Sequence, residues 1–122
     1  MCFEISEEEA VARIDDTSRF ITTLKPLGCR FLLDGFGSTK VSFAYLKRLT
    51  VHFLKIDDNI VRNILRDTVA LGQVKAIQRV CSMVGIRTIA EFVENDELLN
   101  KLKELGLDYA QGFSIDQPKP LA

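Results

Sequence analysis

A repeated pattern constrains the fold of this chain more than any other feature: an apolar run that ends in a charged residue. Residues 31–37 read FLLDGFG, so three apolar residues lead into Asp34 and glycines follow at once. The same pattern recurs at residues 53–57 (FLKID) and at residues 88–91 (TIAE). Such a run is typical of a buried parallel strand that delivers a polar group to the rim of a site.

Segments with helical periodicity or helix caps lie between these runs. Ser6 is expected to cap a helix whose first turn is acidic, and Gly85 is expected to end another helix. The expected strands are residues 1–5, 29–34, 53–56, 86–93 and 109–113, and 57–59 form a turn. The expected helices are residues 6–24 with an irregular stretch at 15–18, 43–49 capped by Ser42, about 60–64, 69–84, and 95–106 capped by Asn95 or Asp96. Residues 118–120 are expected to be irregular.

The alternation of strands and helices predicts an α/β fold with parallel pairing and right-handed crossovers. An open doubly wound sheet and a (β/α) barrel both satisfy this order. Neither GxGxxG nor GxxxxGK[ST] occurs, which removes the main nucleotide-binding forms of the open sheet. Polar residues at the end of strand after strand favour the barrel. The sequence therefore predicts a partial (β/α)8 TIM-type barrel of about five strands, formed by residues 1–122 as a single domain.

Composition excludes several classes of protein. The formal net charge is -1 and the basic residues are scattered, so a nucleic-acid polymer is not an expected partner. No apolar stretch approaches the ~20 residues that a membrane span requires. The three cysteines are far apart and odd in number, which favours a reducing cytoplasm. The single histidine, His52, is expected to have a structural role.

Five motifs, in order and spacing, resemble those of the EAL domain, the family of bacterial phosphodiesterases specific for cyclic di-GMP. They are residues 4–7 (EISE), 33–37 (LDGFG), 54–57 (LKID), 90–94 (AEFVE) and 109–113 (YAQGF). The resemblance covers essentially the whole chain. A complete barrel of this kind has about 250 residues, so only the C-terminal half of the family domain is expected here.

The resemblance implies a role for each motif residue. It implies a catalytic role for Lys55, Glu91 and Gln111, in which the lysine contacts the attacking water. It makes Glu7 the anchor of the loop after the next strand. The implied metal ligands are Glu4, Asp34, Asp57 and Glu94. Oxygen ligands suit Mg²⁺ or Mn²⁺, and such a cation would neutralise phosphate oxygens and acidify a bound water.

The chain departs from the family pattern at several of these motifs. Gly35 stands where the family's DDFG motif has a second aspartate, which weakens a paired metal site. Thr39 and Lys40 replace a loop glycine and a tyrosine, and Phe92 replaces the glycine of AEGVE. These changes lead us to expect a degenerate domain with little or no phosphodiesterase activity.

Three readings of the function remain open on the sequence. The first is a truncated, degenerate domain that senses cyclic di-GMP weakly or binds a protein partner. The second is an active metal-dependent phosphodiesterase, forming pGpG, whose missing strands come from a partner or an unseen segment. The third is a fragment without an autonomous role. A competing interpretation of the strand-end carboxylates is that they merely cap the helices that follow.

An open half-barrel is expected to leave two sheet edges and an apolar face in water. We therefore expect self-association in which another copy covers the open side.

Overall fold

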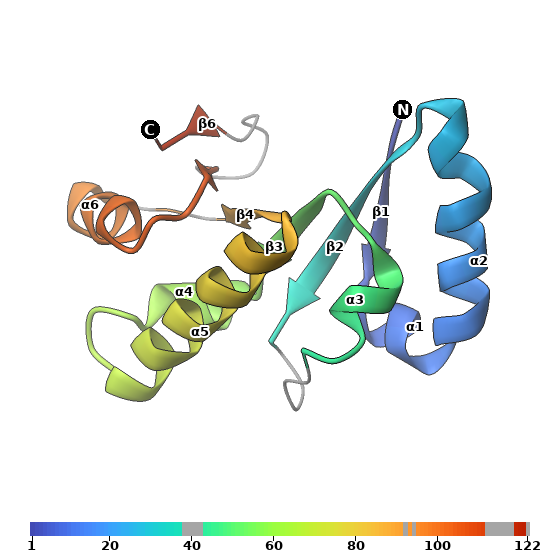
Figure 1. The fold of residues 1–122 in the computed structure, drawn as a ribbon. Helices are drawn as coiled ribbons and strands as arrows, with labels where there is room; N and C mark the ends of the chain where they lie inside the picture. Colours follow the sequence, from blue (N-terminus) through green and yellow to red (C-terminus); the bar gives the residue numbers. More distant parts are fainter. Residues whose placement is uncertain (38–42, 92, 94, 112–118, 122) are drawn as a thin grey trace.

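The computed structural model describes residues 1–37, 43–91, 93, 95–111 and 119–121. The chain alternates strands and helices, as expected (Figure 1). The strands are β1 (Cys2–Ser6), β2 (Arg30–Phe36), β3 (Phe53–Ile56), β4 (Arg87–Ala90), β5 (Tyr109–Ala110) and β6 (Lys119–Pro120). The helices are α1 (Glu7–Ala12), α2 (Ile14–Leu24), the 3₁₀ turn η1 (Lys25–Leu27), α3 (Leu46–Leu49), α4 (Asp58–Arg62), α5 (Thr68–Val84) and α6 (Asp96–Glu104).

The strands form one sheet in chain order, from β1 at one edge to β6 at the other. Neighbours from β1 to β5 pair in parallel, and β6 returns antiparallel to β5. Sequential parallel strands with a helical crossover after each one are the building pattern of a (β/α) barrel. The predicted fold class, an α/β partial barrel, is confirmed.

The two faces of the strands have different surroundings. Side chains alternate along a strand, so Phe31, Leu33 and Leu54 point toward the helices and join the main core. Leu32 and Ile89 lie outside that core cluster, yet they are only 6% and 3% exposed. They therefore lie on the second, inner face of the sheet, and that face is covered by its own neighbouring side chains.

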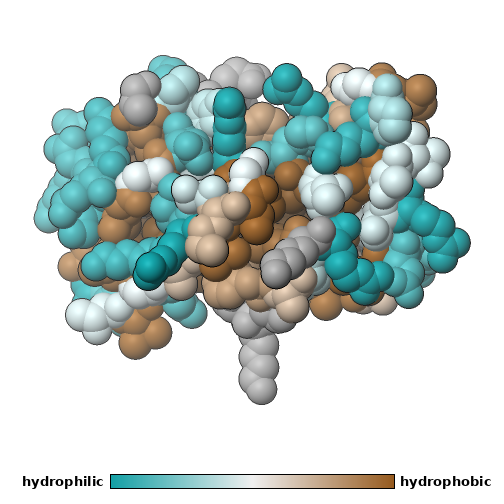
Figure 2. Space-filling model, in the orientation of Figure 1, coloured by the Kyte–Doolittle hydropathy of each residue, from teal (hydrophilic) through white to brown (hydrophobic). Residues whose placement is uncertain are grey.

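The expected exposed apolar sheet face is not found among the described residues. The large apolar side chains that are exposed belong to the N-terminus, helices and connecting segments: Met1, Val11, Phe20, Leu27, Leu65, Val69, Met83 and Val84. In the view of Figure 2, apolar surface gathers near the middle and hydrophilic surface lies on both flanks. Self-association over an open side stays a prediction.

Helix boundaries follow local capping chemistry. Ser6 caps α1 by accepting the N–H of Glu9, and Asn95 caps α6 by accepting the N–H of Leu98. Gly85 ends α5 at a φ of 80°, a left-handed conformation that favours glycine. These three expected caps are confirmed, because each depends on residues close together in the chain.

Several boundaries differ from expectation. The first helix breaks at Arg13, where φ is -131°, rather than at residues 15–18. Asp58 and Asn59 begin α4 instead of forming a turn. The C-terminal Lys119–Pro120 is a strand, because Ala110 and Tyr109 offer it a pairing edge that the local sequence cannot reveal. The strand expected at 86–93 is the shorter β4, and α3 begins at Leu46 rather than at 43.

Two expectations extend beyond the described residues. The cap proposed at Ser42 lies outside them. The strand expected at 109–113 is described only as far as 111, and it is paired at Tyr109–Ala110. No described helix is long and apolar enough to cross a lipid bilayer.

Candidate functional site

Lys55 is the centre of the candidate site, at the carboxyl end of β3. Its ammonium Nζ lies 3.0 Å from Oε1 of Glu4 and 3.1 Å from Oε1 of Glu91, and it donates a hydrogen bond to each. Glu4 belongs to β1 and Glu91 follows β4, so the lysine joins three strands on the inner face. The sequence predicted all three residues, and the structure brings them together.

The surroundings of Lys55 keep it charged. Its side chain is only 10% exposed, and this desolvation by itself lowers the pKa of the amine. The hydrogen bonds and negative charges of Glu4 and Glu91 outweigh the desolvation, so the pKa of Lys55 lies above its ordinary value. The group is therefore an ammonium donor at neutral pH. It can polarise a water or a phosphate oxygen, and it cannot act as a general base.

Two aspartates lie toward the carboxyl ends of the neighbouring strands β2 and β3. Asp34 is in β2 and Asp57 directly follows β3. Desolvation raises the pKa of Asp57, as do the charges of Asp58 and Asp34, while the backbone N–H of Asn59 acts in the opposite direction. The charge of Asp34 thus acts on Asp57 even though β2 and β3 are separate strands. Two anions held in this way attract a cation.

The residue types of this donor set suit a divalent cation, but the described side chains are not arranged as a metal site. Carboxylate oxygens are the ligands that Mg²⁺ and Mn²⁺ prefer. Within the described part of the chain, however, no three His, Cys, Asp or Glu side chains are close enough together to hold a metal ion. One carboxylate oxygen of Glu4 and one of Glu91 already pair with the ammonium of Lys55. Glu94, the fourth expected ligand, lies outside the described residues.

Glu4, Asp34 and Glu91 do not serve as helix caps. The side chains of Ser6 and Asn95 cap α1 and α6, and α3 has no side-chain cap. The competing interpretation, in which these three carboxylates only stabilise helix starts, therefore finds no support in the described residues. Asp57 differs, because it is the N-cap residue of α4 and the backbone N–H of Asn59 acts on its carboxylate.

Glu7 makes a second polar cluster, and it is almost completely buried at 2% exposure. Its Oε2 accepts the backbone N–H of Gly37 at 3.0 Å, and its Oε1 accepts the hydroxyl of Tyr45 at 2.7 Å. Gly37 and Tyr45 lie on either side of residues 38–42 in the chain. Glu7 thus ties the two flanks of that segment to the start of α1.

Tyr45 is the member of this cluster that sequence reasoning missed. Its aromatic ring is buried against Phe36, and burial together with the bond to Glu7 raises its pKa far above the ordinary value. The hydroxyl therefore stays protonated and donates. The sequence feature that could have identified it is a tyrosine directly before the short helix α3. Gly37 is favoured here because its φ of 98° is a left-handed conformation, and a Cβ at this position would also displace Cδ1 of Ile60.

Gln111 is positioned by backbone hydrogen bonds. Its N–H donates to the carbonyl of Ala90 at 2.8 Å, and its own carbonyl accepts the N–H of Val93 at 3.0 Å. These bonds extend the pairing of β4 and β5 past their ends, and they hold Gln111 close to Glu91 in the sheet. Its expected catalytic role stays a prediction.

We predict that Glu7 stabilises the fold through both hydrogen bonds. Glu7→Ala leaves the donors on Gly37 and Tyr45 without their acceptor and should lower the free energy of unfolding by about 1.5–3 kcal/mol. Glu8→Ala changes an exposed glutamate of the same helix turn and should have an effect below about 0.5 kcal/mol. Urea unfolding measures both.

Combining Glu7→Ala with Tyr45→Phe isolates the hydrogen bond between these two side chains. The two changes should be non-additive by at least about 0.5 kcal/mol, because they remove the same contact. Equal losses in the Glu7 and Glu8 variants, or strict additivity with Tyr45→Phe, would contradict the anchoring role.

Comparison with known proteins points to one family. The family model for the EAL domain matches residues 1–118. The cyclic di-GMP phosphodiesterase PdeB of Shewanella oneidensis is 43% identical over 122 residues, which are 100% of this chain and 14% of that protein. The cyclic di-GMP phosphodiesterase PdeF of Escherichia coli is 34% identical over 99% of this chain and 16% of its own length.

A solved structure shares the fold as well. The EAL domain of FimX from Pseudomonas aeruginosa, bound to c-di-GMP, superimposes with a TM-score of 0.85 at 29% identity. The match covers 99% of this chain and 49% of the FimX chain. The chain thus spans less than a fifth of these two relatives and about half of this structural neighbour. The sequence, the sheet order and the family match all agree, and this chain belongs to the EAL domain family.

Proposed function

We propose that this chain forms the Lys55 side of a cyclic di-GMP site and, by itself, hydrolyses the dinucleotide slowly or not at all. The relatives at 43% and 34% identity are named cyclic di-GMP phosphodiesterases, which supports this class of ligand. One observation carries the proposal of weak turnover. The position after Asp34 is Gly35, which offers no ligand beside an otherwise retained set of carboxylates.

The described residues supply part of what phosphodiester hydrolysis needs. Lys55 is held as an ammonium by Glu4 and Glu91, so it can donate to a non-bridging phosphate oxygen or to the attacking water. Glu91, once a ligand displaces one of its contacts, can accept a proton from that water. A bound divalent cation would supply charge neutralisation and a more acidic water.

The loss at position 35 is chemical and not steric. No heavy atom lies within 4 Å of a Cβ built on Gly35, so the space for a longer side chain is open. Its φ of 75° is a left-handed conformation, which costs a non-glycine residue about 1–2 kcal/mol and which aspartate tolerates better than most. An aspartate at this position is therefore compatible with the local backbone.

The alternative function is an active phosphodiesterase completed by a partner or by a further segment of the same protein. The retained cluster of Lys55, Glu4 and Glu91 favours it, because that arrangement is costly to keep without a ligand: three charged groups are partly withdrawn from water. Formation of linear pGpG from cyclic di-GMP by the chain alone, with Mg²⁺ or Mn²⁺, would overturn the leading proposal. Formation of pGpG only when the partner or the further segment is present would support this alternative.

We predict that Gly35→Asp increases cyclic di-GMP hydrolysis in the presence of Mn²⁺. The added carboxylate provides the missing oxygen ligand next to Asp34. Gly35→Ala is the control, since it also places a side chain at this left-handed position but adds no carboxylate. Product formation is followed by chromatography of pGpG. An equal rate in the Asp and Ala variants, or fast turnover by the unaltered chain, would contradict the proposal.

We also predict that a cation binds between Asp34 and Asp57. A carboxyl whose folded-state pKa is raised opposes folding when it is ionised, so at neutral pH Asp57→Asn should raise the melting temperature without metal. Millimolar Mn²⁺ should raise the melting temperature of the unaltered chain, because a cation bound to the folded state offsets the repulsion between Asp57 and Asp34. The Mn²⁺ effect should disappear in Asp57→Asn.

Asp16→Asn is the control for this measurement, because Asp16 is an exposed aspartate of α2. It should keep the full response to Mn²⁺. A response to Mn²⁺ that persists in Asp57→Asn, or that is absent from the unaltered chain, would exclude a cation at this pair.

A further inference from the structure

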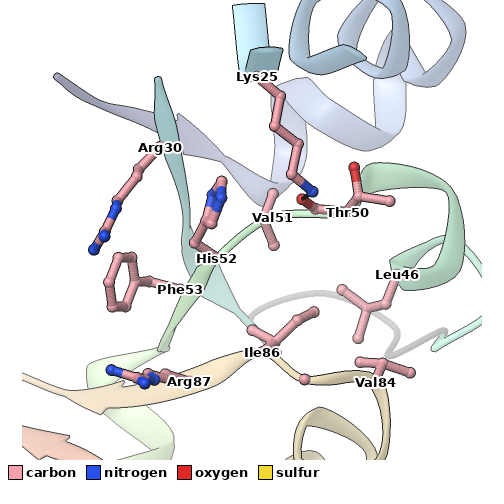
Figure 3. A pocket seen from close by; sticks show the side chains of 11 residues that line it. Lys25, Arg30, Leu46, Thr50, Val51, His52, Phe53, Val84, Ile86 and Arg87 are labelled. Atoms are coloured by element: carbon pink, nitrogen blue, oxygen red, sulfur yellow. Dashed lines mark hydrogen bonds between the residues drawn. The ribbon is translucent and has the colours of Figure 1, made fainter. Parts of the chain in front are cut away.

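A second polar feature lies at the opposite end of the sheet. A pocket of about 640 Å³ opens at the amino ends of the strands, lined by Arg30 at the start of β2, by Phe53 at the start of β3 and by Arg87 at the start of β4 (Figure 3). Parallel strands have their amino ends at one edge and their carboxyl ends at the other. The pocket is therefore separate from Lys55, Glu4 and Glu91, which lie toward the carboxyl ends.

The pocket gathers positive charge from separate elements. Lys25 of η1, Arg30 and Arg87 all line it, and no carboxylate of the described residues does. None of these three cations makes an ion pair within the described part of the chain. The whole chain has a formal net charge of -1, so this concentration of positive charge is a local feature.

Two of the cations are oriented without being neutralised. Nζ of Lys25 donates to the backbone carbonyl of Thr50 at 3.1 Å, and Figure 3 shows the ammonium turned toward that carbonyl. Nη1 of Arg87 donates to the hydroxyl of Tyr109 at 3.0 Å. Both acceptors are uncharged, so both side chains keep their full charge and further N–H groups. Positioned donors of this kind favour an anion.

His52 adds a neutral donor to the same pocket. Its Nδ1 accepts the backbone N–H of Phe31 at 3.1 Å, which assigns the imidazole proton to Nε2. Desolvation lowers the pKa of His52, and the charges of Lys25 and Arg30 lower it further. The ring is thus a fixed N–H donor within a cationic environment.

The size and the aromatic wall of the pocket limit the class of ligand. In Figure 3 the Phe53 ring lies between the side chains of Arg30 and Arg87, and Phe53 also packs edge-on against Tyr109 with ring centroids 6.1 Å apart. The volume is within the range of small-molecule sites, about 300–1,000 Å³. A concave pocket is suited to a small anion, whereas a nucleic-acid polymer requires an extended basic face.

We propose that this pocket is an anion site that binds the phosphate groups of a small phosphorylated molecule through Lys25, Arg30, Arg87 and His52. Arginine forks match phosphate oxygens in pairs, and the lysine adds a point charge. The imidazole Nε2–H completes the set of donors. This site is independent of cyclic di-GMP hydrolysis, because it shares no residue with the carboxylate cluster.

The single histidine makes the test specific. Its Hε1 resonance is the only such histidine signal in a proton NMR spectrum of the chain, and it reports on the pocket directly. Titration with inorganic pyrophosphate at constant pH and ionic strength should shift this resonance in a saturable manner. Sodium chloride at the same ionic strength should not. An unchanged resonance, or an equal shift with chloride, would overturn the proposal.

Variants identify the groups that bind the probe. Arg87→Gln and Lys25→Gln should each weaken pyrophosphate binding by about tenfold, the loss expected for one charge-assisted hydrogen bond. Arg79→Gln is the matched control, because Arg79 is exposed on α5 and does not line the pocket. Isothermal titration calorimetry measures the affinities, and circular dichroism checks that each variant is folded. Equal weakening by Arg79→Gln would show that binding depends only on the overall charge of the chain, and it would overturn the proposal.

Discussion

The contact of the Lys55 ammonium with Glu4 and Glu91 is the interaction on which the candidate site depends. It exists because the strands pair in parallel and in chain order, so that β1, β3 and β4 present their carboxyl ends at one edge. A lysine that is 10% exposed would be destabilised without anionic partners. The fold therefore brings the two glutamates to the lysine, and the glutamates keep the lysine charged. Without β1 or β4, Lys55 would lose one of the two glutamates that keep it charged.

The structure has a different chemical character at the two ends of its sheet. The carboxyl ends hold carboxylates around one ammonium, while the amino ends hold three cations and an imidazole around a pocket. The near-zero net charge of the sequence conceals this separation, because 17 acidic and 16 basic residues nearly cancel over the whole chain. An acidic end suits a cation and a basic end suits a phosphate. The proposed functions of the two ends follow from this difference.

Sequence reasoning succeeded where the signal was local or repeated. Ser6, Gly85 and Asn95 act on neighbours in the chain, so their caps could be predicted. The parallel order followed from repeated apolar runs, and the resemblance to a known family assigned Lys55 and Glu91. The contact between Glu7 and Tyr45 joins residues 38 positions apart. A pattern of neighbouring residues cannot reveal a contact over that separation in the chain.

The remaining differences also come from tertiary contacts. The strand at Lys119–Pro120 depends on the free edge of β5, and the burial of Leu32 and Ile89 depends on neighbours from other strands. The basic pocket unites Lys25, His52 and Arg87, which are scattered in the sequence. None of these features has a periodicity that a sequence could reveal. Each becomes visible only when the register of the sheet is known.

The decisive measurement for the candidate site is the charge state of Lys55. Lysine side chains labelled with ¹⁵N at Nζ can be followed by NMR as the pH is raised. We predict that the Lys55 signal titrates at a pKa above the ordinary value for lysine, because Glu4 and Glu91 stabilise the ammonium. Titration below the ordinary value would mean that desolvation dominates and that the two glutamates do not hold the lysine, and it would contradict the proposed site.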